Sequence, residues 1–177
     1  SALSAYDFLL DFDNNATNLS DLADLYYNLS EYELAIEYYE LSLALYDSNY
    51  DYVYWWNQRR LAESYWEMDL DKKALSILNS VLENPDIIPD SEIQYIYSQR
   101  GLYFHFDGKF KKAEADYRKA YSLIASPENS IKLTELYWTE HDTLNVYKTS
   151  SLALSKTQNT TDSLLLLESL YNIETDW

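Results

Sequence analysis

The amino-acid sequence predicts an all-α fold assembled from repeated helical hairpins, and three observations lead to this prediction. Only two glycines and three prolines occur in 177 residues, so few residues interrupt a helix. Apolar side chains recur at the spacing of a helix over most of the chain, rather than alternating as they do in a strand. Two sequence positions also recur together along the chain, which is typical of a helical repeat array.

The recurring pair consists of an aromatic residue and a small residue. The aromatic residue Tyr26 is repeated at spacings of 39, 39, 33 and 34 residues, as Tyr65, Phe104, Tyr137 and Tyr171. The small residue Ala35 is repeated at the same offsets, as Ala74, Ala113 and Val146. Because the two positions move together, each repeat is predicted to form the same helical hairpin.

The third repeat illustrates the predicted hairpin. A helix over about residues 91–106 is followed by Asp107 and Gly108, and glycine readily takes the left-handed conformation that ends a helix. A second helix then runs to about residue 124. The two longer spacings are explained by five extra residues in each of two segments, NYDYV and IIPDS, which are expected to lengthen the first helix or the loop before it.

Four stretches share a longer pattern of large and small residues. Residues 94–127 carry the fullest set, namely Tyr97, Gly101, Phe104, Gly108, Ala113, Tyr117 and Ala120. Residues 16–49 carry Leu19, Leu22, Ala23, Tyr26, Ala35 and Tyr39. Residues 55–88 carry Leu61, Ala62, Tyr65, Ala74 and Leu78. Residues 127–160 match only through Leu133, Tyr137 and Ala153.

This pattern resembles the tetratricopeptide repeat, a helix-turn-helix unit of about 34 residues, in a long-period form of the kind found in bacterial proteins. Departures from the family pattern include Arg100 in place of leucine and Ser30 in place of the turn glycine. The resemblance implies a single domain over residues 1–177, a right-handed α-solenoid of about four repeats with a concave wall of first helices. Residues 1–12 and 161–177 are expected to be partial units, each a single flanking helix.

The charge of the chain limits its partners. The net charge is −17 and the isoelectric point is near 4.2, so a nucleic-acid backbone would be repelled and such binding is not expected. All 13 lysines and arginines lie from Arg59 onward, while residues 1–58 contain 11 acids, which favours a basic partner. The longest aliphatic run, residues 164–167, is too short to span a bilayer, so direct membrane insertion is not expected.

The resemblance implies a ligand-binding wall on the first helices. In the family, five positions of the first helix contact peptide ligands, and on this sequence they give the candidate groove residues Tyr27, Trp56, Arg59, Glu63, Trp66, Tyr95, His105, Phe106, Glu135 and Trp138. The twelfth repeat position alone gives an aromatic-rich ladder, Tyr27, Trp66, His105 and Trp138. The rings of this ladder either anchor a ligand or pack half-buried against the next repeat, and the sequence leaves both roles open.

Catalysis is not expected from this chain. The two histidines, His105 and His141, lie in different repeats, and the sequence contains no cysteine, no glycine-rich phosphate loop and no cluster with metal-ligand spacing. We therefore expect no cofactor and no metal. The lysine-rich segment KFKKAEADYRKA, residues 109–120, is expected in the turn and second helix of its repeat, where it either balances nearby acids or docks an acidic neighbour.

The sequence therefore predicts a non-catalytic protein–protein interaction module, a scaffold whose acidic, aromatic-lined groove binds a peptide or partner segment with apolar and basic side chains. The alternative is a sensor or regulatory segment of a larger bacterial signalling or transcription-regulating protein, since the chain stops within a repeat at Trp177. Apolar faces at two unfinished ends favour a homo-oligomer. No signal-like segment is present, and a cytoplasmic and an exported location both stay open.

Overall fold

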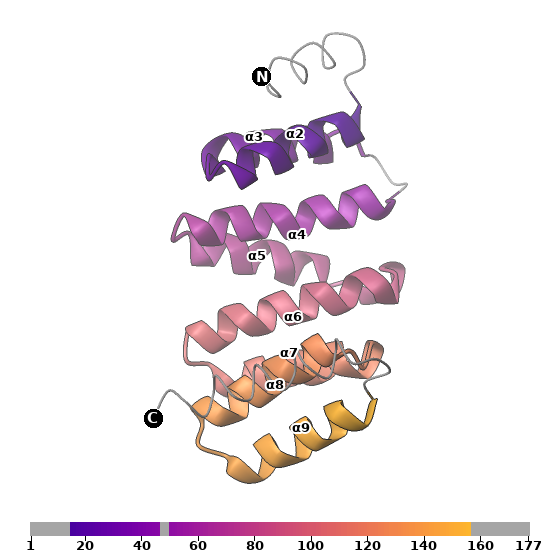
Figure 1. Cartoon of the computed structure of the whole chain (residues 1–177). Helices are drawn as coiled ribbons and strands as arrows, with labels where there is room; N and C mark the ends of the chain where they lie inside the picture. Colours follow the sequence, from indigo (N-terminus) through magenta and orange to yellow (C-terminus); the bar gives the residue numbers. More distant parts are fainter. Residues whose placement is uncertain (1–14, 47–49, 157–177) are drawn as a thin grey trace. The chain divides into compact units, whose positions relative to one another are not determined.

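The computed structural model describes residues 15–46 and 50–156, and its secondary structure there consists of helices without strands. The predicted all-α fold is thus confirmed. The helices, labelled in Figure 1, are α2 (Ala16–Asn28), α3 (Tyr32–Leu43), α4 (Tyr52–Glu67), α5 (Asp71–Val81), the 3-10 helix η1 (Pro85–Ile87), α6 (Asp90–Phe106), α7 (Phe110–Leu123), α8 (Pro127–Thr139) and α9 (Thr143–Lys156). The partial units expected at residues 1–12 and 161–177 lie outside the described residues.

Consecutive helices pair into the predicted hairpins. The pairs are α2 with α3, α4 with α5, α6 with α7 and α8 with α9, and Figure 1 shows a short turn within each pair. The contacts divide the chain into two compact units, of which unit 1 ends at Ile88 and unit 2 begins at Pro89. Unit 1 contains α2 to α5 and unit 2 contains α6 to α9. The single domain and the right-handed superhelix stay predictions.

The two helices of every hairpin are joined by the same kind of turn. Its left-handed residue has a positive φ in all four hairpins, at Ser30 (60°), Asp69 (57°), Gly108 (68°) and His141 (57°). The next residue donates its backbone N–H to a carbonyl five residues back, as Lys109 does to Phe104 at 2.8 Å, which is the Schellman type of helix end. The prediction for Gly108 is confirmed, and three other turns adopt this conformation without glycine.

The extra residues of the second and third repeats lengthen the first helix. Helix α4 has 16 residues and α6 has 17, whereas α2 and α8 have 13 each. Asp51, within the extra segment, caps α4 by accepting the backbone N–H of Tyr54 at 3.1 Å. Tyr50 and Asp51 of NYDYV and residues 87–89 of IIPDS lie before α4 and α6, so both predicted alternatives are observed: the first helix and the segment before it are each longer.

Small residues let the helices of each unit approach closely. In unit 1, Ala23 of α2, Ala35 of α3 and Leu61 of α4 are buried together with the ring of Tyr39. In unit 2, Gly101 of α6 lies so close to α7 that a Cβ at this position would be 2.7 Å from the Tyr117 ring. These are the small and aromatic positions that define the predicted repeat, so the repeat pattern is a pattern of close helix packing.

Candidate functional site

The candidate groove residues of unit 1 lie on its two first helices, α2 and α4, which contact each other. Tyr27 belongs to α2, and Trp56, Arg59, Glu63 and Trp66 belong to α4. All five are half-buried. The structure therefore brings the predicted residues of this unit onto two adjacent helices.

Asp24 of α2 links the two helices of this set. Its carboxylate accepts hydrogen bonds from Tyr39 Oη, from Trp56 Nε1 at 3.0 Å and from Arg60 Nε at 3.2 Å. Arg60 in turn donates to the Glu63 carboxylate at 2.8 Å. A carboxylate shared by three donors restricts the rotamers of all of them, so Asp24 fixes the orientation of Trp56 on the wall.

Two aromatic rings on the first helices of unit 1 have an arginine guanidinium packed on one face. The Cζ atom of Arg60 is 3.8 Å from the ring centroid of Tyr27, and that of Arg59 is 4.6 Å from the Trp56 ring. Tyr27 also meets Tyr32 edge-on, with the centroids 5.4 Å apart. Burial raises the pKa of the Tyr27 hydroxyl, so this group stays neutral at pH 7. The contacts observed for Tyr27 are thus packing contacts within unit 1.

The candidate residues of unit 2 lie on its first helices, α6 and α8, which also contact each other. Tyr95 and Phe106 of α6 are 42% and 73% exposed, so their rings are open to solvent. His105 of α6 and Trp138 of α8 are half-buried, while Glu135 of α8 is exposed. Unit 2 therefore combines exposed rings with a carboxylate on two neighbouring helices.

His105 joins the ends of the two first helices of unit 2. Its Nε2 atom lies 3.1 Å from Thr139 Oγ1, within hydrogen-bond distance. Burial lowers the pKa of His105, so the imidazole is neutral at pH 7. Like the other residues of the twelfth-position ladder, Tyr27, Trp66 and Trp138, it is half-buried. Partial burial fits a ring that packs on its own unit and still presents an edge to solvent.

Two acids on the first helices have raised pKa values. Burial, followed by the negative charge of Asp24, raises the pKa of Asp21 on α2. Burial likewise raises the pKa of Glu135, and the charge of Lys132 opposes this rise only in part. Both acids are exposed as whole residues, so the cause is partial loss of water around the carboxyl group rather than deep burial. Each carboxyl group therefore lacks enough nearby positive charge to offset its lost hydration.

Two ion pairs that organise the units were not among the predicted site residues. In unit 1 the pair is Arg60 with Asp24, and in unit 2 Arg100 binds Asp116 through two hydrogen bonds of 2.7 and 2.8 Å. The sequence did carry a signal for the second pair, because Arg100 stands where the family pattern has leucine, and a buried cation requires an acid. No comparable signal exists for the first pair.

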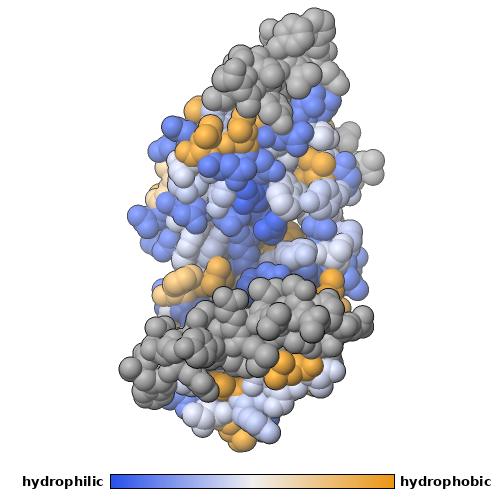
Figure 2. Space-filling model, in the orientation of Figure 1, coloured by the Kyte–Doolittle hydropathy of each residue, from blue (hydrophilic) through white to orange (hydrophobic). Residues whose placement is uncertain are grey.

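Metal and membrane sites were sought in the same residues. Over residues 15–46 and 50–156, no group of three or more His, Asp or Glu side chains is placed to hold a metal ion. No described helix is long and apolar enough to cross a membrane. Figure 2 shows a face that is largely hydrophilic, with apolar residues in small separate patches. Recognition on such a surface requires polar contacts as well as rings.

Comparison with known proteins gives one family and several similar folds. The family model described as "Tetratricopeptide repeat" matches residues 16–49 and 95–127. Comparison with curated proteins gives no match. Among solved structures, the chain is similar to TTC0263, a thermophilic TPR protein of Thermus thermophilus, with 22% identity, a TM-score of 0.70, and coverage of 96% of this chain and 89% of that one.

Two further structures of similar fold are named with a ligand or a binding site. One is YrrB, a TPR protein with an unusual peptide-binding site, at 16% identity and a TM-score of 0.62, covering 94% of this chain and 82% of that one. The other is a Rap protein complexed with competence and sporulation factor, at 19% identity and a TM-score of 0.70, covering 91% of this chain. The chain spans 44% of the length of that protein.

The family match falls on two of the four repeats that the sequence predicts. The matched segments coincide with the first and third repeats, and the described residues of all four repeats form helical hairpins with the same turn. The match to TTC0263 covers 96% of the chain. The chain therefore carries tetratricopeptide repeats and has the all-α helical repeat fold of tetratricopeptide-repeat proteins.

Proposed function

We propose that this chain is a non-catalytic interaction module whose first helices bind a partner segment carrying basic and apolar side chains. The observation that carries the proposal is the pair Glu135 and Trp138 on α8. These residues are three positions apart on one helix and are therefore neighbours on its surface. Burial raises the pKa of Glu135, and a bound cation would stabilise its ionised carboxylate. A lysine or arginine bound there would also reach the Trp138 ring.

The fold and the similar structures support this proposal. Tetratricopeptide repeats act in general as interaction modules rather than as catalysts, and this chain carries them. YrrB is named for its peptide-binding site, and the Rap protein was solved with competence and sporulation factor. In unit 1, burial also raises the pKa of Asp21, which lies on the first helix α2. Each unit therefore carries one carboxyl group with a raised pKa on a first helix.

The proposal is tested by fluorescence anisotropy with labelled peptides that contain arginine and leucine, compared with peptides in which glutamate replaces arginine. We expect preferential binding of the basic peptide. Trp138→Ala should weaken its binding about tenfold or more, and Glu135→Gln about two- to fivefold, because the first removes a ring contact and the second an ion pair. Glu140→Gln removes the same charge near the end of α8 and is the matched control.

The pH dependence of binding separates a contact at Glu135 from general attraction. A cation favours the ionised carboxylate, so binding releases protons and affinity should fall when the pH is lowered from about 7 to about 5. Glu135→Gln should make the affinity nearly independent of pH, while Glu140→Gln should leave the pH dependence unchanged. If the basic and acidic peptides bind equally, or if the two glutamine variants behave alike, the proposed recognition is wrong.

A second candidate function is favoured by the similarity to the Rap protein. In that case the chain would be a sensor or regulatory segment whose ligand controls the activity of a larger bacterial signalling or transcription-regulating protein. Sequencing the complete gene tests this candidate, which expects a kinase or DNA-binding region in the same protein. A gene that encodes these repeats alone would contradict it and leave the simple interaction module.

A further inference from the structure

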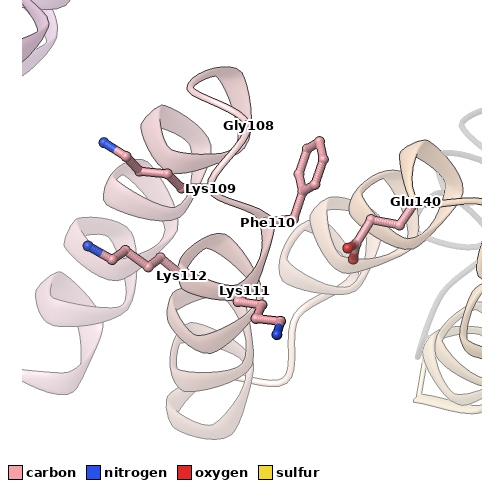
Figure 3. Close-up of a pocket in the computed structure, with 6 residues that line it drawn as sticks. All are labelled: Gly108, Lys109, Phe110, Lys111, Lys112 and Glu140. Atoms are coloured by element: carbon pink, nitrogen blue, oxygen red, sulfur yellow. The ribbon is translucent and has the colours of Figure 1, made fainter.

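A cavity of about 430 Å3 opens in unit 2 beside the turn between α6 and α7. Its lining consists of Gly108, Lys109, Phe110, Lys111 and Lys112 around the start of α7, together with Glu140 after the end of α8. Figure 3 shows Phe110 and Lys111 on the side of α7 that faces Glu140, with Lys109 and Lys112 on its other side. Three lysines and a ring therefore line one open space at the start of α7. The candidate groove residue His105 borders it, because its ring centroid lies 5.8 Å from that of Phe110.

The three lysines stand where a helix disfavours positive charge. The start of a helix carries a partial positive charge from its unpaired N–H groups, so acids are favoured in the first turn. Helices α5, α6 and α8 follow this rule with Asp71, Asp90 and Glu128, whereas the first turn of α7 contains no acid and two lysines. The lysines and the helix dipole thus add to a local positive field in a chain of net charge −17.

Little of this positive charge is neutralised within the chain. Lys109 pairs with Asp107, and the Lys112 ammonium lies 5.3 Å from the centroid of the Phe104 ring. Lys111 and Lys112 form no ion pair in the part of the chain that the structure describes, whereas Arg60, Arg100 and Arg118 all do. Two lysine charges beside the cavity are therefore available to an incoming carboxylate.

We propose that this cavity docks a short acidic segment of a partner protein that carries one aromatic side chain. Carboxylates of such a segment would pair with Lys111 on one side of α7 and with Lys112 on the other, while its ring would pack on Phe110. Glu140 opposes such a ligand and limits its affinity. The cavity thus takes acidic side chains, whereas the groove proposed above takes basic ones, and the contact of Phe110 with His105 makes the two surfaces neighbours.

A short partner segment is favoured over a second copy of this chain by the same charges. Residues 1–58 supply 11 acids and no base, so a second copy does offer an acidic surface. However, two chains of net charge −17 repel each other as whole molecules, whereas a peptide with four acids experiences far less repulsion. The cavity volume also lies within the range of about 300–1,000 Å3 that is typical of pockets for small ligands, which is enough for a few side chains of a short segment.

The test uses the full chain and three fluorescein-labelled peptides, Glu-Glu-Trp-Glu-Glu, Gln-Gln-Trp-Gln-Gln and Glu-Glu-Ala-Glu-Glu, in about 20 mM and about 150 mM salt. The first peptide should bind most tightly, and its affinity should fall at the higher salt concentration. Lys111→Gln/Lys112→Gln should weaken it about five- to tenfold. Lys72→Gln/Lys119→Gln removes the same charge from exposed positions outside the cavity and should change the affinity less than about twofold.

Two further variants test the cavity itself. Glu140→Gln should strengthen binding of the first peptide about two- to fivefold, because it removes the opposing charge. Phe110→Leu should weaken binding of the tryptophan peptide and leave the affinity for the alanine peptide unchanged. Thermal unfolding of each variant, followed by circular dichroism, verifies that the helices are retained, and the gain expected for Glu140→Gln cannot arise from unfolding.

Three results would overturn the proposal. If Lys111→Gln/Lys112→Gln and Lys72→Gln/Lys119→Gln weaken peptide binding equally, the peptide is attracted only by the overall charge of the protein. Equal affinity for the peptides with glutamate and glutamine would exclude carboxylate recognition. The third measurement is sedimentation of the protein alone in about 20 mM salt. If the protein forms dimers and Lys111→Gln/Lys112→Gln abolishes them, a second copy of this chain is the occupant.

Discussion

The two units each bury an arginine beside an aspartate, but the two pairs connect different helices. In unit 1, Arg60 of α4 reaches Asp24 of α2, so the pair joins the first helices of successive repeats. In unit 2, Arg100 of α6 forms an ion pair with Asp116 of α7, so the pair lies within one hairpin. The first shapes a candidate binding wall, whereas the second takes the place of a core leucine.

The surroundings of the two pairs differ as well. The Asp24 side chain is 27% exposed and shares its oxygens among three donors, so the loss of one donor leaves others. The Asp116 side chain is only 7% exposed, and Arg100 binds both its oxygens. Water can therefore replace a lost partner of Asp24 far better than a lost partner of Asp116, which predicts unequal effects of mutation.

The largest effect is expected from Arg100→Leu, although it restores the residue of the family pattern. It leaves the Asp116 carboxylate buried without a partner and should lower the free energy of unfolding by about 3–5 kcal/mol in urea titrations. The double variant Arg100→Leu/Asp116→Ala removes the stranded charge and should recover most of this loss. Equal stability of the single and double variants would contradict the proposed role of the pair.

An intermediate effect is expected from Asp24→Ala in unit 1. It removes the acceptor of Tyr39, Trp56 and Arg60, and it should cost about 2 kcal/mol, because the site is open enough for water to satisfy part of these donors. The same variant should weaken binding of a basic peptide more than Arg100→Leu/Asp116→Ala does, since it frees Trp56 and Arg60 on the wall. A greater loss of stability than in Arg100→Leu would reverse the comparison between the units.

The smallest effect is expected at the turns, where the first hairpin of unit 1 differs from the first hairpin of unit 2. Unit 1 has Ser30 at a left-handed position and unit 2 has Gly108, whose Cβ would meet no atom within 4 Å. Gly108→Ala should therefore lower stability by about 1 kcal/mol through backbone strain alone, and Ser30→Gly should raise it by about 0.5–1 kcal/mol. Thermal unfolding measures both changes, and a stabilising Gly108→Ala would disprove the strain.

Much of the fold could be predicted because it depends on residues close together in the sequence. The pair Tyr26 and Ala35 fixed the repeat register, and the turn at Gly108 followed from the backbone freedom of glycine. The left-handed turn at His141 was not predicted, although its spacing of 33 residues from Gly108 equals that of the third and fourth repeats. The candidate groove residues lie on the first helices α2, α4, α6 and α8, and their role stays a prediction.

The sequence by itself determined the helices and the hairpins, because each depends on local backbone preference and on the repeat of small and aromatic residues. Only the tertiary structure decided that Arg60 meets Asp24, that Arg100 meets Asp116, and that three lysines share a cavity with Glu140. The Arg60–Asp24 pair joins residues 36 positions apart and the Arg100–Asp116 pair joins residues 16 positions apart. Lys111 and Glu140 are 29 positions apart in the sequence. These contacts exist only once helix packing has brought the side chains within hydrogen-bond or cavity distance.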